Sequence, residues 1–220
     1  MLDRRKIIQG LCLLIFSFTL ISPYIVRNFD NTEKFHIVNS SGYALWKGNN
    51  QITDVEGFLN PLHPDDRSSW PQIKDFERLY KKLDNIKKDH TYEIKRDEVF
   101  KEEAIKNILS DKSKYFFLYT KKFFSYFFID FNSSIKNYYN IAHIFPVILI
   151  ALLSIPGLII CLTKNKNKKT IYLTLITLLI VSVISVFNIL PRYKISIISF
   201  QIIFSLFLYN YYFLKFKKNS

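Results

Sequence analysis

The apolar residues of this 220-residue chain are concentrated in four long segments, none of which contains a charged side chain. These segments are residues 7–26, 138–163, 170–191 and 195–214. About twenty apolar residues in an α-helix cross roughly 30 Å of hydrocarbon, and a helix satisfies its own backbone hydrogen bonds there. Helices buried in a soluble core would instead need more covering chain than the remaining residues supply. The pattern therefore predicts a mainly α membrane protein with four transmembrane helices.

This prediction divides the chain into three parts. Residues 1–27 contain the first transmembrane helix, residues 28–140 form an extracytoplasmic domain, and residues 141–220 contain three transmembrane helices joined by short loops.

The extracytoplasmic domain is predicted to be mostly helical because it contains two amphipathic patterns. Residues 73–86 place apolar side chains on one face of a helix, and Pro71 suits its first turn. A second helix is expected to begin near Arg96-Asp97 and to be interrupted at Ser110-Asp111. Its apolar stripe consists of Val99, Phe100, Ala104, Ile105, Ile108 and Leu109.

Less regular chain precedes these helices. Residues 34–46 alternate weakly at Phe35, Ile37 and Val38, which predicts a short extended stretch. The Gly-Asn-Asn sequence at residues 48–50 is a turn signal. Residues 60–72 contain three prolines and are expected to form an irregular loop.

Residues 114–131, KYFFLYTKKFFSYFFIDF, are rich in aromatic side chains but contain Lys121 and Lys122 in the middle. Two adjacent lysines argue against a transmembrane helix, whereas aromatic rings beside basic residues suit the membrane–water boundary. We therefore expect an interfacial aromatic helix on the outer leaflet. A core helix of the extracytoplasmic domain is the alternative.

The net charge of +13 is distributed in a way that predicts the topology. Residues 27–141 contain 19 Lys and Arg against 17 Asp and Glu, so the excess positive charge lies in short flanks of the apolar segments. Three of these flanks fall on one side if the chain alternates, which is the positive-inside pattern. Both termini and residues 164–169 are therefore expected in the cytoplasm. Because the large polar part is nearly neutral, no nucleic-acid partner is expected.

The N-terminal sequence MLDRRKIIQGLCLLIFSFTLIS also fits a signal peptide, with a basic start and an apolar centre. However, the apolar run is long and Pro-Tyr-Ile follows it in place of a small-residue cleavage site, which favours an uncleaved helix. The composition, rich in Lys, Asn, Ile and Phe, is typical of AT-rich bacterial genomes. We therefore expect a multi-pass protein of the bacterial inner (plasma) membrane.

The sequence offers no metal or cofactor motif. Its four histidines show no paired ligand spacing, and it contains no HExxH, CxxC or glycine-rich phosphate loop. We expect neither a cofactor nor a metal, and we assign no catalytic residue.

Three stretches, in chain order, carry a resemblance to a known family. Residues 22–50, SPYIVRNFDNTEKFHIVNSSGYALWKGNN, contain a helix end with an Arg-Asn exit and then a Gly-x-x-Leu-Trp-x-Gly-Asn-Asn loop. Residues 92–127 contain a Glu-x-x-Arg-Asp helix, and residues 190–200 read LPRYKISIISF. Together they resemble the C-terminal part of GT-C-type polytopic membrane glycosyltransferases, the enzymes related to protein mannosyltransferases and aminoarabinose transferases. The chain differs from them at Lys194, where the family has Arg, and lacks two prolines that follow.

This resemblance implies a function on the outer face of the membrane. The family uses a sugar donor linked to polyprenyl phosphate, and its acidic catalytic residues lie in a first outer loop that this chain does not contain. A general base must reach the acceptor hydroxyl directly or through one water. The chain would therefore be incomplete without an upstream catalytic half or subunit, and its partners would be membrane lipid and the polyprenyl-phosphate sugar donor.

The same resemblance suggests which residues contact the donor. Charge on a leaving lipid phosphate needs a cation at the bilayer surface, and Arg27 and Arg192 both stand at predicted outer boundaries, with Tyr193 as a further hydrogen-bond donor. In the loop, Trp46 would anchor at the interface while Lys47, Asn49 and Asn50 face polar substrate groups. The alternative for the arginines is ordinary interface anchoring. For the loop it is a Gly-Asn turn with Trp46 packed beneath it.

A non-enzymatic protein is the second hypothesis. It would cross the membrane four times and bind a lipid-linked glycan or a partner protein through its outer domain. An upstream reading frame that encodes further spans and an acidic outer loop would favour the glycosyltransferase.

Overall fold

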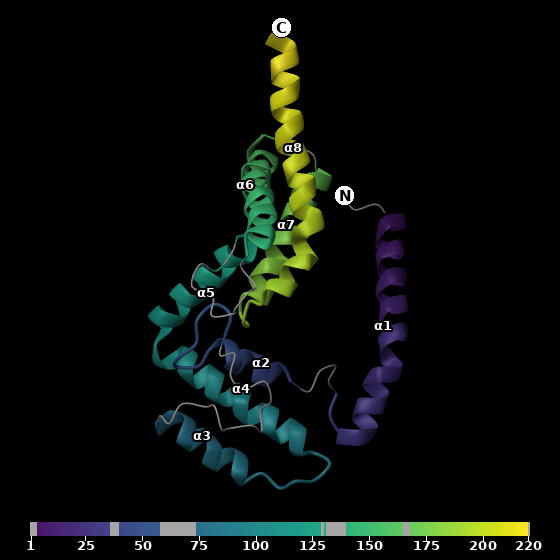
Figure 1. The fold of residues 1–220 in the computed structure, drawn as a ribbon. Coiled ribbons are helices and arrows are strands. Elements are labelled where there is room, and N and C mark those ends of the chain that lie inside the picture. The colour runs from purple at the N-terminus through teal and green to yellow at the C-terminus, as the bar shows by residue number, and fades with distance from the viewer. Residues whose placement is uncertain are drawn as a thin grey trace. The chain divides into compact units, whose positions relative to one another are not determined.

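The computed structural model describes residues 4–35, 40–57, 74–128, 130, 140–164 and 168–219. Every regular element in these ranges is a helix, which confirms the mainly α prediction (Figure 1). The chain folds into two compact units. The first comprises Met1–Tyr43 and Pro71–Glu102, and the second comprises Ala44–Trp70 and Glu103–Ser220. The predicted loop over residues 60–72 and the start of the 73–86 helix lie mainly outside the described residues.

In the first unit, α1 (Arg4–Thr32) is the predicted first apolar helix. Its side chains are exposed along nearly the whole length, and residues Ile7–Thr32 are long and apolar enough to cross a membrane. The hydroxyl groups of Ser17 and Thr19 donate to helix carbonyls at 2.8 and 2.9 Å, which satisfies these polar groups within an apolar helix. The helix continues past the predicted boundary at residue 27 and ends at Thr32, directly before Glu33, whose φ is 56°.

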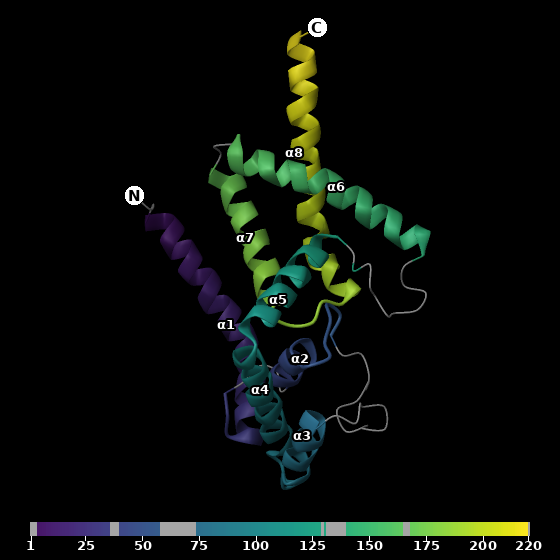
Figure 2. The same cartoon turned by 90° about the vertical axis from the view of Figure 1, so that its left-hand side faces the viewer.

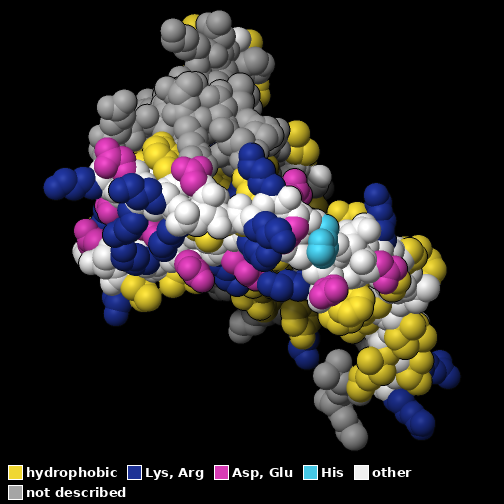
Figure 3. Space-filling model, turned by 90° about the horizontal axis from the view of Figure 1, so that it is seen from below, with side chains coloured by type: hydrophobic (Ala, Val, Ile, Leu, Met, Phe, Trp, Pro, Cys, Tyr) yellow, Lys and Arg dark blue, Asp and Glu magenta, His cyan; other side chains and the backbone are white. Residues whose placement is uncertain are grey.

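The first unit also contains α3 (Lys74–Asp84), which buries Phe76, Leu79 and Leu83 as the periodicity predicts. α4 (Tyr92–Ser110) begins about one turn before the predicted position at Arg96-Asp97. A turn directly precedes it, in which the Asp89 carboxylate accepts the backbone N–H of Thr91 at 2.9 Å and its hydroxyl at 2.6 Å. Figure 3 shows the face that includes α3, where Lys, Arg, Asp and Glu side chains are interspersed.

A short helix, α2 (Ser41–Gly48), occupies the second half of the stretch that was predicted to be extended, so that prediction is wrong. The carboxylate of Asp97 accepts the backbone N–H groups of Gly42 and Tyr43 at 2.8 and 2.7 Å. These are N–H groups of the first helical turn, which have no partner within the helix. A residue distant in the sequence therefore stabilises a helix that the local pattern does not indicate. Ile37 and Val38 lie outside the described residues.

The first helix that lies entirely in the second unit is α5 (Lys112–Phe127). Asp111 is its N-cap and accepts the N–H of Lys114 at 3.0 Å, which confirms the predicted interruption at Ser110-Asp111. The stripe predicted for the preceding helix is only half correct: Phe100 and Ala104 are buried, whereas Ile105 and Leu109 are exposed. Whether α5 lies at a membrane interface stays a prediction.

Three apolar helices complete the second unit: α6 (Ile141–Thr163), α7 (Lys168–Ile184) and, after the 3-10 helix η1 (Pro191–Lys194), α8 (Ile195–Asn219). α6 packs closely on α8, since a Cβ added at Gly157 would collide with the carbonyl group of Phe204. In both views α7 runs back from the end of α6 towards the start of α8 (Figures 1 and 2).

Among the described residues, three helices are long and apolar enough to cross a membrane: Ile7–Thr32, Ile144–Thr163 and Ile195–Tyr212. These three helices indicate an integral membrane protein. The predicted third span, residues 170–191, is helical only to Ile184. Residues 185–190 leave the helix and pack elsewhere, with the N–H of Ile189 donating to the carbonyl of Val55 at 2.9 Å.

Candidate functional site

The sequence ALWKGNN completes α2 and turns directly into a loop, residues 48–57, which we call the GNN loop. The N–H of Asn49 donates to the carbonyl of Trp46 at 2.9 Å, and the hydroxyl of Thr53 donates to the carbonyl of Lys47 at 2.6 Å. Trp46 is 1% exposed. The turn predicted at residues 48–50 is therefore confirmed, and Trp46 is buried, as the alternative reading of this loop expected.

The side chains of Asn49 and Asn50 form hydrogen bonds with backbone groups of the protein. The Asn49 amide donates to the carbonyls of Leu45 and Val186, each at 2.8 Å. The Asn50 amide donates to the carbonyl of Trp46 at 3.3 Å, and its side-chain oxygen accepts the N–H of Ile52 at 3.1 Å. Both residues are buried. Their positions suit a role in shaping the loop, while Lys47 is half-buried beside them.

A buried ammonium group lies behind this loop. Lys122 of α5 has no exposed surface, and its Nζ donates to the carbonyl of Gly48 at 2.6 Å and to Asn49 Oδ1 at 3.4 Å. Burial lowers the pKa of Lys122 to about 7, and the nearby carboxylate of Asp54 opposes that change. Asp54 itself forms an ion pair with Lys121 at 2.6 Å.

The GNN loop packs against residues 185–190, which join α7 to η1 and which we call the connector. The N–H of Ile189 donates to the carbonyl of Val55 at 2.9 Å. A Cβ added at Gly48 would lie 2.6 Å from the carbonyl carbon of Phe187, so only glycine permits this approach. The amide of Asn49 reaches the same connector at Val186. Residues 48–50 therefore pack against the chain that leads into residues 190–200.

A second buried cation lies at the end of the connector. Lys194 Nζ donates to the carbonyl of Phe128, and burial lowers the pKa of Lys194 to about 8, while Asp130 and Glu56 oppose that change. The backbone of Tyr193 is held by the hydroxyl of Tyr126, which donates to the Tyr193 carbonyl at 2.7 Å. The backbone around Arg192 is thus held before it by the bond between Ile189 and Val55, and after it by the bonds of Tyr193 and Lys194.

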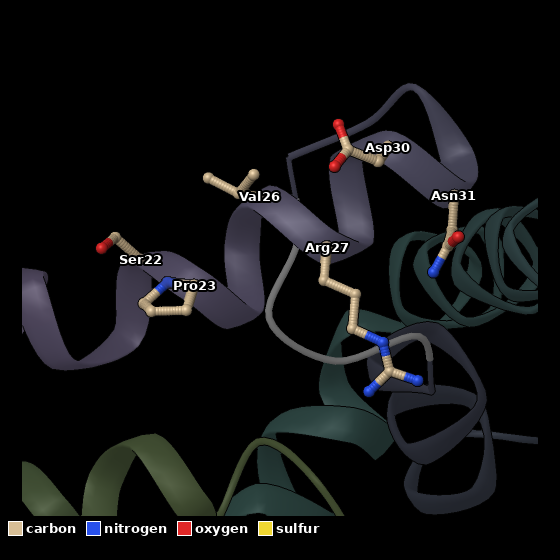
Figure 4. Close-up of a pocket in the computed structure, with 6 residues that line it drawn as sticks. All are labelled: Ser22, Pro23, Val26, Arg27, Asp30 and Asn31. Carbon is tan, nitrogen blue, oxygen red and sulfur yellow. The ribbon is translucent and has the colours of Figure 1, made fainter.

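Arg27 lies in the other unit, on the last part of α1. It borders a groove of about 650 Å3 together with Ser22, Pro23, Val26, Asp30 and Asn31, all from the same helix. The guanidinium of Arg27 and the carboxylate of Asp30 point in different directions (Figure 4). Arg27 is exposed, and it makes no hydrogen bond or ion pair with the described residues.

The predicted site residues fall into three groups. Asn49 and Asn50 lie in the GNN loop and Lys47 lies just before it at the end of α2, while Tyr193 follows the connector against which that loop packs. Arg27 belongs to the first unit. The backbone of Arg192 is in η1, but its side chain lies outside the described residues.

Sequence reasoning did not identify Lys122 as part of this arrangement. In the sequence, the adjacent lysines Lys121 and Lys122 argue only against a transmembrane helix. A signal was nevertheless present, because Lys122 follows Tyr115 and Leu118 at helical spacing, and all three are buried. A lysine on the apolar stripe of an amphipathic helix indicates a buried partner.

The arrangement can position backbone and cations between the end of α7 and the start of α8, and among the described residues it contains no recognisable catalytic group. Within the part of the chain that the structure describes, no group of three or more His, Cys, Asp or Glu side chains could hold a metal ion. No protein-family model, curated protein or solved structure matches this chain.

Proposed function

We propose that the chain crosses the membrane four times, with residues 28–140 on the outer side and both termini in the cytoplasm of a bacterial cell. The geometry of α7 supports this count. α7 has 17 residues and is therefore about 25 Å long, and residues 170–191 contain no charge. If α6 and α8 both cross the bilayer in the same direction, as cytoplasmic termini require, α7 must carry the chain back between them.

The proposed topology can be tested by labelling. Ser113→Cys on the exposed side of α5, in a Cys12→Ser, Cys161→Ser background, should react with a membrane-impermeant maleimide in intact spheroplasts. A cysteine placed at Ser220 should react only after the membrane is opened. Labelling of residue 113 only after the membrane is opened would contradict this orientation.

We further propose that the chain is the C-terminal portion of a membrane glycosyltransferase that uses a polyprenyl-phosphate-linked sugar. The contact between the GNN loop and the connector is the observation that supports this most directly. It joins residues 137 positions apart, and it brings one stretch that resembles the family against the chain that leads into another. It lies shortly before α8, one of the three candidate membrane-crossing helices in the described part of the chain, where the phosphate of a lipid-linked donor would be found.

In this function the residues have distinct roles. Arg192 and Tyr193 would hold the lipid phosphate, because a guanidinium can form two parallel hydrogen bonds with phosphate oxygens. Lys122 and the two asparagines would act as positioning residues, which fix the connector. The base that deprotonates the acceptor would come from an upstream catalytic part.

Sugar transfer in membranes tests the proposal. Membranes from cells with and without this chain would be supplied with a radiolabelled polyprenyl-phosphate sugar, and label in the acceptor would be measured. We expect transfer to require the chain, to fall roughly tenfold or more for Arg192→Ala and to be partly retained for Arg192→Lys. Transfer that does not depend on the chain would refute the function, and equal transfer by all three forms would remove Arg192 from the site. Retention of the donor without transfer would favour the non-enzymatic binding protein.

A further inference from the structure

The second half of α5 carries an exposed surface that is aromatic and uncharged. Phe116, Phe117 and Phe124 are 68%, 70% and 58% exposed. Thr120 lies between them at helical spacing, and its hydroxyl donates to the carbonyl of Phe116 at 2.9 Å, so this polar group is satisfied within the helix. We call these four residues the aromatic face. Large apolar side chains grouped on an exposed surface mark a site of contact with lipid or with another molecule.

The lysines in this half of the helix are held by the GNN loop. Residues 115–128 contain two charged side chains, Lys121 and Lys122. Lys121 forms its ion pair with Asp54 at 2.6 Å, and Lys122 is fully buried against the carbonyl of Gly48. An unpaired ammonium group beside the phenylalanines would oppose contact with hydrocarbon, because a charge is costly there. The GNN loop removes this obstacle, since it supplies a partner to each lysine.

The same half of α5 packs against α7 and α8. The hydroxyl of Tyr119 donates to the carbonyl of Ser182 in α7 at 3.3 Å. The amide of Gln201 in α8 donates to the carbonyl of Phe127, the last residue of α5, at 3.3 Å. Gln201 lies six residues after Ile195, where the candidate membrane-crossing helix begins, which is about 9 Å along α8. The end of α5 therefore lies level with residues inside this helix.

We propose that the second half of α5 is embedded in the membrane leaflet in which α7 ends and α8 begins, with the aromatic face against lipid chains. Lipid is the occupant because α5 is joined to α8 at a depth where lipid surrounds a membrane-crossing helix. The first turn, with Lys112 and Lys114 exposed, stays among the headgroups. The helix expected from the sequence would instead keep its central lysines at the boundary. The proposal requires that α8 crosses the membrane, and it does not require sugar transfer.

Spin labels on the full chain in phosphatidylcholine–phosphatidylglycerol liposomes test this placement. Phe117→Cys and Phe124→Cys, each in the cysteine-free background of the topology test, would carry a nitroxide, and its accessibility to oxygen and to a water-soluble nickel chelate would be compared. Oxygen concentrates in hydrocarbon and the chelate stays in water. We expect the oxygen-to-nickel ratio to be severalfold higher at both positions than at Lys106→Cys, and higher at 124 than at 117. Lys106 is the control because it is exposed on α4 in the same unit.

Leu206→Cys provides the lipid reference, since Leu206 is 56% exposed within the candidate membrane-crossing part of α8. A ratio at residues 117 and 124 as low as that at Lys106→Cys would overturn the proposal, because the aromatic face would then lie in water. Low accessibility to both reagents would also overturn it, since protein would then cover the face. A low ratio at Leu206→Cys would overturn it together with the membrane crossing of α8.

The role of the GNN loop is tested in the same assay. Asp54→Asn removes the ion pair with Lys121 but keeps an acceptor for the N–H of Val55, which Asp54 binds at 2.9 Å. We expect the ratio at residue 124 to fall, because an unpaired ammonium group draws the helix towards the headgroups. Addition of Lys121→Met should restore the ratio. An unchanged ratio in Asp54→Asn would overturn the claim that the loop permits the helix to enter lipid.

Discussion

Replacement of Lys122 by Met should remove a pH dependence of stability that the unmodified chain possesses. In the folded chain the buried Lys122 has a pKa of about 7, whereas in the unfolded chain it returns to the ordinary value of 10.5. Between these values the unfolded chain binds a proton that the folded chain does not bind. The free energy of unfolding must therefore rise with pH across this window. Below pH 7 both states are protonated, and above about pH 10.5 neither is, so the contribution is constant outside the window.

The size of this effect follows from the width of the window. Each pH unit within it adds about 1.4 kcal/mol to the free energy of unfolding. Between about pH 7 and pH 9, Lys122 should thus add about 2–3 kcal/mol, and Lys122→Met should lack this increase. The Met variant also loses two hydrogen bonds and leaves the carbonyl of Gly48 unsatisfied, which costs about 1–3 kcal/mol at either pH. The difference between the two proteins should therefore be larger at the higher pH.

Fluorescence of Trp46 provides the assay, because Trp46 is buried beside the GNN loop. A Trp70→Phe background would leave it as the only tryptophan, and denaturant unfolding in detergent would be compared at several pH values from about 6.5 to 9.5. Lys122→Arg is the matched variant, since a guanidinium stays protonated and should also lack the rise. Parallel pH profiles for the unmodified chain and Lys122→Met would refute the claim that this ammonium group is desolvated.

Three further predictions concern the same packing and use the same unfolding measurement unless stated. Asn49→Ala should lower the free energy of unfolding by about 2–3 kcal/mol, because two buried carbonyls lose their donor; the exposed Gln51→Ala should change it little, and equal losses would contradict this role. Gly48→Ala should cost about 1–3 kcal/mol, since the new Cβ would meet connector backbone at 2.6 Å. Gly10→Ala, with open space around it, is its control. Asp97→Ala should cost about 1 kcal/mol and reduce helical circular dichroism through loss of the α2 cap. An equal reduction by the exposed Glu102→Ala would argue against a specific cap.

The sequence predicts best those elements whose cause is local. The apolar segments and the α3 stripe are confirmed as helices because hydrophobic periodicity is a property of neighbouring residues. α2 was missed because its N-terminal N–H groups depend on Asp97, which lies 55 positions from Gly42. The early end of α7 has a similar cause, since Ile189 pairs with Val55 in preference to continuing a helix.

The candidate site shows the same division. The Gly-Asn-Asn turn could be predicted from residue type, and its burial could not. Asn49 and Asn50 look available to a substrate when only the sequence is considered, because polar side chains in a turn are usually exposed. In the structure, Lys122 and Val186 lie against this loop from positions 73 and 137 residues away. Such partners decide whether an amide faces solvent or backbone.

These contacts give the GNN loop a function that does not require it to touch a substrate. Its bonds to Val186 and Ile189 fix the connector, and Tyr126 and Phe128 hold Tyr193 and Lys194 at the start of α8. Arg192 lies between these fixed points, so its backbone position depends on residues that are far from it in sequence. A buried lysine is costly, and it is retained here where its carbonyl partners close the loop. Under the proposed function, in which Arg192 binds the lipid phosphate, loss of Lys122 should therefore weaken that binding indirectly, and to a smaller extent than Arg192→Ala.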